Sequence, residues 1–252
     1  MATRTISKLL PEVDYTHLEP LPDPPKEEPD MMNREGIKAF DLALDLYFAN
    51  RSDVLVSGEG YLRQEAGNEW ERFAPDGMVV FGVRPDYIIP RNGYVISEVG
   101  KPPDFVLEVA SRSTGRRDYT VKRDGYERLG VEEYWRFDHT GGRFHDAALA
   151  GDLLVDGKYE PLPIHHDADG LIWGHSPVLG LDLCWVDGRL RFRDPATEDF
   201  LPRPSELDAQ ARDDRAARDA AESRAAQDRA AREAAEAEVA RLREQIRRMS
   251  RG

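Results

Sequence analysis

The chain has 252 residues, of which 40% are hydrophobic and 33% are charged, and its formal net charge is -13 at pH 7. This size and composition fit one globular domain with a more polar segment, rather than two full hydrophobic cores. The acidic balance argues against broad adhesion to nucleic acid, because that adhesion depends on positive side chains that neutralise phosphates.

No apolar stretch reaches the roughly 20 residues that cross a bilayer. The first residues lack the hydrophobic core segment and small-residue cleavage site of a secretory signal. We therefore expect a cytoplasmic protein without a membrane partner. The single cysteine, Cys184, lies in an apolar run, where core packing is the expected role.

Three segments follow one another along the chain. Residues 1–33 are rich in proline and acid, as in "PDPPKEEPD", and we expect a disordered tail. Residues 34–203 are expected to form the folded domain, which begins with a helix in "REGIKAFDLALDLYFAN". Short β-prone runs follow at residues 53–57, 77–83, 104–110, 132–137, 152–162 and 179–192.

The order of elements indicates an α/β or α+β fold with a mixed sheet flanked by helices. Between the third and fourth β-prone runs, residues 114–130 are predicted to be a helix that ends at Gly130. The Asp-Gly pairs in "VDGK" and "VDGR" predict two tight hairpins, so the later part of the domain is expected to be antiparallel.

Residues 204–252 are rich in alanine and arginine and contain no internal glycine. They predict a helix of more than 40 residues, roughly 60 Å long. Two interpretations stay open: a solitary charged helix in solvent, or a thin coiled coil that makes the protein a homo-oligomer. Apolar residues at coiled-coil spacing are clear only near the end, at Val239, Leu242, Ile246 and Met249.

The run "DFVLEVAS" carries an acid inside an apolar strand pattern. Phe105, Leu107 and Val109 are expected to point to one face of the strand, and Glu108 to the other. Burying an unpartnered carboxylate is costly, so Glu108 should be paired, exposed at the strand end or bound to a metal.

Three Pro-Asp pairs precede apolar runs, at Asp76, Asp86 and Asp104. Two such carboxylates on adjacent strands would make an oxygen site for magnesium, whereas a single Asp after Pro is often only a turn residue. Lys122 lies between Tyr119 and Tyr126 at helical spacing, and could either reach Glu108 or extend its ammonium into water.

The ordered set "APDGMVVFGV", "PPDFVLEVAS", a lysine four residues before Tyr126 with "GVEEYW" after it, and "SPVLGL" resembles the Uma-two family of bacterial restriction endonucleases. That family is a branch of the PD-(D/E)XK nuclease superfamily. The resemblance covers about residues 34–250 and implies a restriction-endonuclease-like fold.

The resemblance also implies roles for particular residues. Asp76 matches the first metal-binding carboxylate and Glu108 matches the acid of the (D/E)XK element, with Ala110 in place of the usual lysine. Lys122 matches a lysine that has migrated to the following helix. Asp76, Glu108 and the backbone carbonyl of Val109 would hold magnesium or manganese.

The function implied is a divalent-metal-dependent endonuclease that hydrolyses phosphodiester bonds, with DNA as the expected substrate and RNA as an alternative. Asp76, Glu108 and Lys122 would be the catalytic residues, with the lysine orienting the attacking water or stabilising the transition state. A second interpretation keeps the nuclease-like fold but makes the protein a non-catalytic binding or assembly module that acts through its C-terminal helix.

Overall fold

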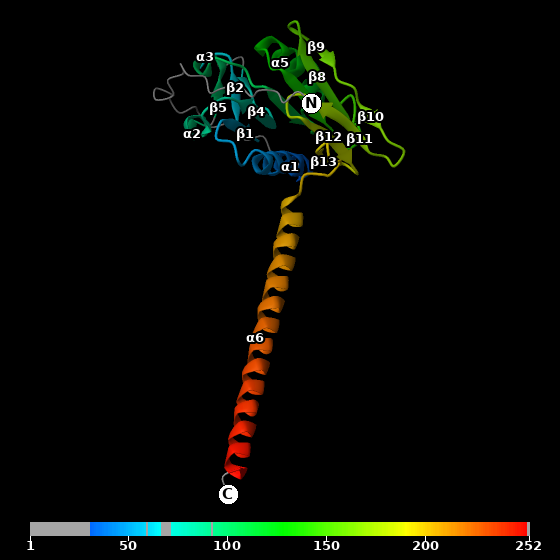
Figure 1. Ribbon diagram of the computed structural model, residues 1–252. Helices are drawn as coiled ribbons and strands as arrows, with labels where there is room; N and C mark the ends of the chain where they lie inside the picture. Colours follow the sequence, from blue (N-terminus) through cyan, green and yellow to red (C-terminus); the bar gives the residue numbers. More distant parts are fainter. Residues whose placement is uncertain (1–30, 59, 67–71, 92, 251–252) are drawn as a thin grey trace. The chain divides into compact units, whose positions relative to one another are not determined.

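The computed structural model describes residues 31–58, 60–66, 72–91 and 93–250 (Figure 1). The chain divides into two compact units, one that ends at Leu201 and one that begins at Pro202. The expected acidic tail, residues 1–33, lies outside the described residues except for residues 31–33, which belong to the first helix, α1 (Met31–Tyr47).

A mixed six-stranded sheet forms the centre of the first unit. Within this sheet, β6 pairs with β7 in parallel, and the other neighbours are antiparallel. The strands, in their order across the sheet, are β1 (Val54–Ser57), β4 (Gly77–Phe81), β6 (Phe105–Val109), β7 (Glu133–Phe137), β8 (Leu149–Val155) and β9 (Lys158–Pro161).

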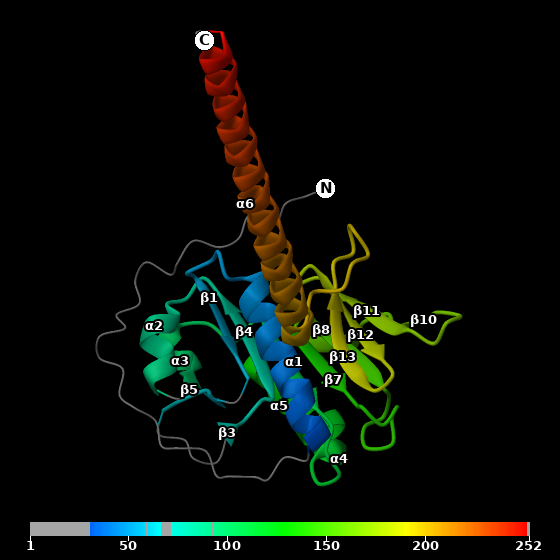
Figure 2. The ribbon, with the colours of Figure 1, turned by 90° about the horizontal axis from the view of Figure 1, so that it is seen from below.

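One face of this sheet is covered by α1 and by a second, antiparallel sheet, with α1 lying between β4 and β13 in Figure 2. The apolar face of α1 contributes Ile37, Phe40 and Leu44 to a core that also contains Phe105, Leu107 and Val109 of β6. The second sheet consists of β10 (His165–His166), β11 (Ile172–Ser176), β12 (Leu181–Val186) and β13 (Arg189–Arg193).

The opposite face carries a second apolar cluster, which includes Val106 of β6 together with Tyr126 and Tyr134. Residues 105–109 are all buried, and alternate residues enter the two clusters as the strand pattern predicted. The smaller elements around this cluster are β2 (Tyr61–Arg63), β3 (Arg72–Phe73), β5 (Gly93–Val95), α2 (Pro85–Ile88), η2 (Ile89–Arg91) and α3 (Ile96–Val99).

A helical segment connects the parallel strands β6 and β7, as predicted for residues 114–130. It consists of α4 (Gly115–Arg117), the single π-helical turn η3 (Asp118–Lys122) and α5 (Arg123–Leu129). Gly130 ends it in the left-handed conformation, with φ of 79°. The π turn was not foreseen.

Both Asp-Gly pairs form the tight turns predicted from the sequence. Asp156 and Gly157 join β8 to β9, with φ of 49° and 79°, and Asp187 and Gly188 join β12 to β13 with the same two values. Positive φ at both central residues is the requirement of the hairpin turn that Asp-Gly favours. Cys184, on β12, is buried, as expected.

The second unit is a 46-residue helix, α6 (Pro204–Met249), close to the length predicted. The Glu206 carboxylate accepts a hydrogen bond from the backbone N–H of Arg203 at 2.9 Å and so satisfies one donor at the helix start. The expectation of a mixed α/β fold with a long C-terminal helix is confirmed. None of the helices in the described residues combines the length and the apolar character needed to span a membrane.

Candidate active site

The register of the central sheet brings Asp76 and Glu108 together. Gly77 of β4 lies opposite Leu107 of β6, so the preceding residue, Asp76, stands opposite Glu108. Asp76 Oδ2 also accepts a hydrogen bond from the backbone N–H of Val109 at 2.8 Å. The two predicted metal-binding acids are therefore neighbours, and Val109 contributes its amide to holding one of them.

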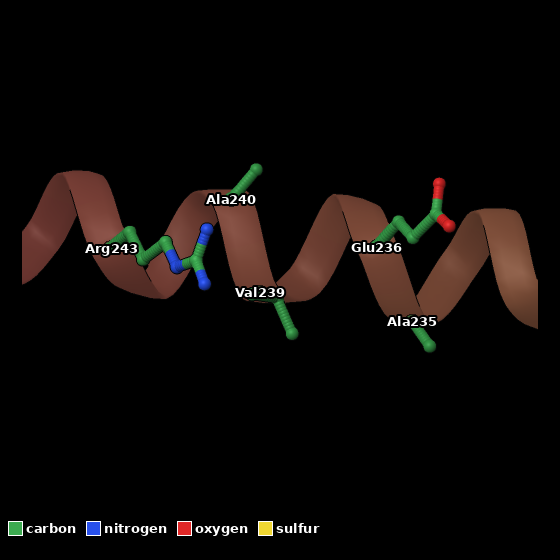
Figure 3. Close-up of a pocket in the computed structure, with 5 residues that line it drawn as sticks. All are labelled: Ala235, Glu236, Val239, Ala240 and Arg243. Carbon is green, nitrogen blue, oxygen red and sulfur yellow. The ribbon is translucent and has the colours of Figure 1, made fainter.

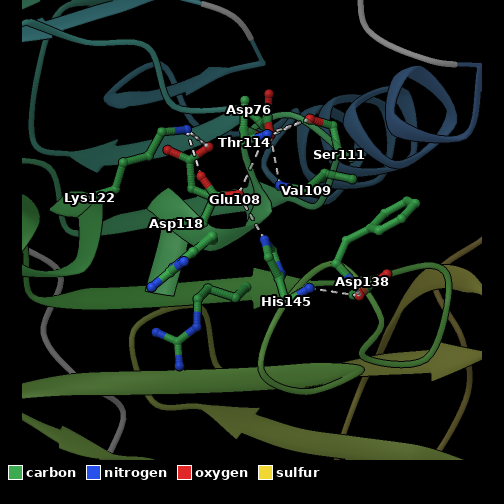
Figure 4. Close-up of polar contacts among 12 residues, drawn as sticks. Asp76, Glu108, Val109, Ser111, Thr114, Asp118, Lys122, Asp138 and His145 are labelled. Carbon is green, nitrogen blue, oxygen red and sulfur yellow. Dashed lines mark hydrogen bonds and ion pairs between the residues drawn. The ribbon is translucent and has the colours of Figure 1, made fainter. Parts of the chain in front are cut away.

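Glu108 is fully buried, and both of its oxygens have partners. Lys122 Nζ lies 2.7 Å from Oε2 (Figure 4), and the Tyr126 hydroxyl donates to Oε1 at 2.6 Å. Both partners come from the helical segment that follows β6 and passes over the face to which Glu108 points. Lys122 therefore reaches the glutamate rather than extending into water.

Asp118 is a third buried acid at the same place, and sequence reasoning missed it. One carboxylate oxygen lies 2.9 Å from Lys122 Nζ, and the other lies 2.8 Å from Nε2 of His145. The regular helical spacing grouped Tyr119 with Lys122 and Tyr126. The residue that shares Lys122 with Glu108 is instead Asp118, which lies four residues before the lysine and so also within helical reach of it, while Tyr119 is only half-buried.

His145 reaches Asp118 from the loop between β7 and β8. Asp138, directly after β7, accepts hydrogen bonds at one oxygen from the backbone N–H groups of Phe144 and His145, at 2.7 and 2.9 Å. Its other oxygen accepts from Thr140. This carboxylate folds the loop back so that the buried imidazole meets Asp118, a contact that no periodic pattern in the sequence indicates.

The electrostatics of the site are dominated by three buried carboxylates around one ammonium. Burial raises the pKa of Asp76 to about 6, although Lys122 and the Val109 N–H lower it. Burial likewise raises the pKa of Glu108 well above its usual value, against the pull of Lys122. Removing a carboxylate from water disfavours its charged form, and neighbouring acids add to that cost.

Lys122 shows the opposite balance. Burial lowers its pKa, but Coulombic attraction from Glu108, Asp118 and Asp76 outweighs burial, so the pKa lies above its ordinary value. The lysine therefore stays positively charged at neutral pH. A permanently charged ammonium can stabilise negative charge or orient a polar group, but it cannot act as a proton acceptor.

The donor set fits a divalent cation. When ionised, Asp76, Glu108 and Asp118 carry more negative charge than Lys122 alone neutralises, and the raised pKa values of Asp76 and Glu108 reflect a cost of ionisation that a bound cation would relieve. Among the residues that the structure describes, no three or more His, Cys, Asp or Glu side chains are arranged as a metal-binding group. Magnesium does not require such a group, because it is commonly held by one or two carboxylates and keeps several waters.

The other two Pro-Asp pairs lie elsewhere. Asp104, just before β6, forms an ion pair with Lys101 at 2.7 Å and accepts a hydrogen bond from the Phe81 N–H at 2.8 Å. Asp86 is exposed in the first turn of α2. Of the three aspartates, only Asp76 stands opposite Glu108.

Comparison with known proteins identifies the family. The model of the Uma2 family, described as "Putative restriction endonuclease", matches residues 32–183. The chain belongs to the Uma2 family. The matched part of this Uma2 chain includes Asp76, Glu108, Lys122 and His145, and the resemblance seen in the sequence is confirmed.

Among solved structures, the Uma2 chain matches the crystal structure of "a putative nuclease belonging to DUF820" from Anabaena variabilis ATCC 29413. The sequence identity is 12% and the TM-score is 0.38, and the match covers 57% of this chain and 76% of the other. Comparison with curated proteins gives no match.

Proposed function

We propose that the protein is a divalent-metal-dependent endonuclease that hydrolyses the phosphodiester bonds of DNA. The observation that carries the proposal is the register of β4 and β6, which sets Asp76 opposite Glu108, with the Lys122 ammonium 2.7 Å from that glutamate. Membership of the Uma2 family supports nuclease chemistry at this place.

Asp76 and Glu108 are the residues that would hold magnesium or manganese, with the backbone carbonyl of Val109 as the third protein ligand. When bound, the cation supplies Lewis-acid stabilisation for the negative charge that develops on the phosphoryl oxygens. The hydrogen bond from the Val109 amide and the partner on each oxygen of Glu108 keep the two carboxylates in place.

Lys122 is the residue that would act on the reacting groups. Ion pairs with Glu108 and Asp118 hold the Lys122 ammonium in place beside the buried acids. A small part of the lysine side chain is exposed to solvent. From this position it would orient the attacking water or stabilise the pentacovalent phosphorus, since a fixed positive charge is most effective where water is excluded.

DNA would approach over the turn that follows β6. Arg112, Arg116 and Arg117 are exposed there, within a few residues of Glu108 in the chain. Arginine contacts to phosphate position a duplex without reading its sequence. These three side chains would supply local positive charge on a body that is acidic as a whole.

The test is cleavage of supercoiled plasmid in the presence of magnesium. Asp76→Asn, Glu108→Gln and Lys122→Met should each lower the cleavage rate at least about 100-fold, as expected when a group that stabilises the transition state is removed. Asp86→Asn is the matched control, because it changes a Pro-Asp pair away from Glu108. A Glu108→Gln protein that is folded and cleaves plasmid at the wild-type rate would contradict the proposal.

Calorimetric titration of magnesium and manganese tests the metal separately. Binding should be present in the wild type, in Lys122→Met and in Asp86→Asn, and absent in Asp76→Asn and Glu108→Gln. Wild-type protein that binds neither ion but cleaves DNA in the presence of a chelator would contradict the metal part of the proposal and leave the nuclease part standing.

A further inference from the structure

The last turns of α6 expose large apolar side chains to water. Val239, Leu242, Ile246 and Met249 are 46%, 48%, 67% and 83% exposed. Their spacing of three, four and three residues places them on one side of the helix. Alanine and charged residues make up most of the rest of α6, so these four side chains form a distinct apolar stripe.

Three charged residues of the same turns, Glu244, Arg247 and Arg248, lie on the other side of the helix. Glu244 forms ion pairs with Arg247 at 2.7 Å and with Arg248 at 3.1 Å. If Val239 and Ile246 occupy heptad position a, then Glu244, Arg247 and Arg248 occupy positions f, b and c, which face away from a coiled-coil partner. The ion pairs therefore stabilise the helix itself and leave the apolar stripe uncovered.

The helix surface also has a shallow hollow where such a partner would pack. The hollow is lined by Ala235, Glu236, Val239, Ala240 and Arg243 (Figure 3). Ala235 and Val239 leave the helix on the same side in this view. In a coiled coil, each inserted side chain enters a hole formed by four residues of the facing helix. Positions d, e and a, here Ala235, Glu236 and Val239, are three corners of such a hole.

We propose that α6 pairs with α6 of a second copy of this chain, as a parallel two-stranded coiled coil over residues 235–249. The residue types select this arrangement. Position a holds the β-branched Val239 and Ile246, and position d holds Leu242. This combination favours parallel dimers over trimers and tetramers.

The register supports the parallel orientation. In a parallel pair of helices, Ala235 and each of the four residues of the apolar stripe lie opposite the same residue of the second copy. In an antiparallel pair, at least one of these five residues lies opposite a residue outside the set. Parallel pairing also sets Glu238, at position g, opposite Arg243 of the second copy, at position e five residues later. Opposite charges at these positions stabilise the pairing.

Sedimentation velocity of the full chain tests the dimer. Wild-type protein at tens of micromolar should have the mass of two chains, and Leu242→Glu/Ile246→Glu should have the mass of one. Ala234→Glu/Ala237→Glu adds the same charge at positions c and f and should remain a dimer. A monomeric wild type, a trimer or tetramer, or a dimer that survives Leu242→Glu/Ile246→Glu would overturn the proposal.

Disulfide trapping tests the orientation. With Met249→Cys, copper–phenanthroline oxidation should give a covalent dimer, because a disulfide requires Cα atoms about 4.4 to 6.8 Å apart. Antiparallel pairing would separate the two copies of this position by at least about 15 Å. Ala237→Cys, on the outer face, should stay uncrosslinked, and Cys184 is buried. A dimer that Met249→Cys fails to trap would overturn the parallel arrangement.

Discussion

Asp118 gives Lys122 a second carboxylate partner that is independent of Glu108. If Glu108 alone held the ammonium, any cation bound by Glu108 would compete with the lysine for the same oxygen. Asp118, itself held by His145 at 2.8 Å, lies 2.9 Å from the ammonium and keeps it at the site. Asp118 is therefore a positioning residue for Lys122.

Asp118→Asn should lower kcat for DNA cleavage by about 10- to 100-fold, the range seen when a group that orients an active-site residue is removed. KM should change little, because Asp118 is buried and does not reach the substrate. Asp124→Asn, on the exposed side of α5, is the control. Steady-state kinetics of cleavage measure both constants. A folded Asp118→Asn protein with the wild-type kcat would contradict the assignment of Asp118 as a positioning residue for Lys122.

Glu133, on β7, is a buried acid away from the candidate site. It accepts hydrogen bonds from the Ser176 hydroxyl and the Val178 N–H, yet burial outweighs them and raises its pKa to about 8. Between about pH 4.5 and 8, the Glu133 carboxyl is therefore protonated in the folded protein and ionised in the unfolded chain. Stability conferred by this proton is lost as the pH rises from about 4.5 to 8.

Glu133→Gln should remove that pH dependence, because an amide oxygen can accept the same two hydrogen bonds without ionising. Between about pH 5 and 8 the wild type should lose about 1.4 kcal/mol of unfolding free energy per pH unit from this group, relative to the variant. Urea denaturation at several pH values measures the difference. Parallel curves for the two proteins would show that Glu133 ionises normally in the folded state.

At the scale of elements, the contact of α1 with β4 requires a glycine beside the candidate site. A Cβ atom at Gly77 would lie 2.8 to 2.9 Å from ring carbons of Phe40, which is fully buried. Gly77 directly follows Asp76 and pairs with Leu107, so a shift of β4 would also move Asp76 relative to Glu108.

Gly77→Ala should therefore destabilise the fold by about 1 to 3 kcal/mol, the usual cost of overpacking a core. It should also lower cleavage more than stability alone explains. Phe40→Leu in the same chain makes room for the new methyl group, so the double variant should be more stable than the sum of the two single changes predicts. Additive effects in thermal denaturation would show that the ring does not set the position of β4.

Elements were predicted well from the sequence where a local pattern determines the geometry. Alternation in residues 104–111 placed Glu108 on the face opposite Phe105, Leu107 and Val109, and the Asp-Gly pairs predicted both hairpins. Asp118 was missed although it lies four residues before Lys122, a spacing that brings side chains together on a helix; the expected face grouped the lysine with two tyrosines and left this acid out. His145 was missed because its loop meets Asp118 through tertiary contacts, which no local periodicity encodes.

For the molecule as a whole, charge is distributed unfavourably for DNA binding. Residues 208–252 carry 11 arginines and 10 acids, a net charge of +1, so residues 1–207 carry a net charge of -14. Any phosphate contact must therefore come from local groups of arginine, and each such contact makes binding more sensitive to salt.

Replacing Arg112, Arg116 and Arg117 with Gln should weaken DNA binding and reduce the slope of log affinity against log salt by about one for each phosphate that the variant no longer binds. Arg212→Gln/Arg215→Gln/Arg218→Gln changes the net charge equally on α6 and should leave the slope unaltered. Fluorescence anisotropy with Asp76→Asn protein measures binding without cleavage. Equal slopes for the two triple variants would place the DNA elsewhere.

The register of β6 also constrains how the length of this chain can vary. Successive side chains of β6 enter opposite cores, so adding or removing one residue between Asp104 and Glu108 would exchange their faces. The acid would then enter the apolar core beneath α1, and a valine or leucine would face Asp76 and Lys122. Across natural variants and insertion libraries alike, we expect changes of length to be tolerated in surface loops but not in this short strand, because a shift of one residue would move Glu108 from the candidate site into the apolar core.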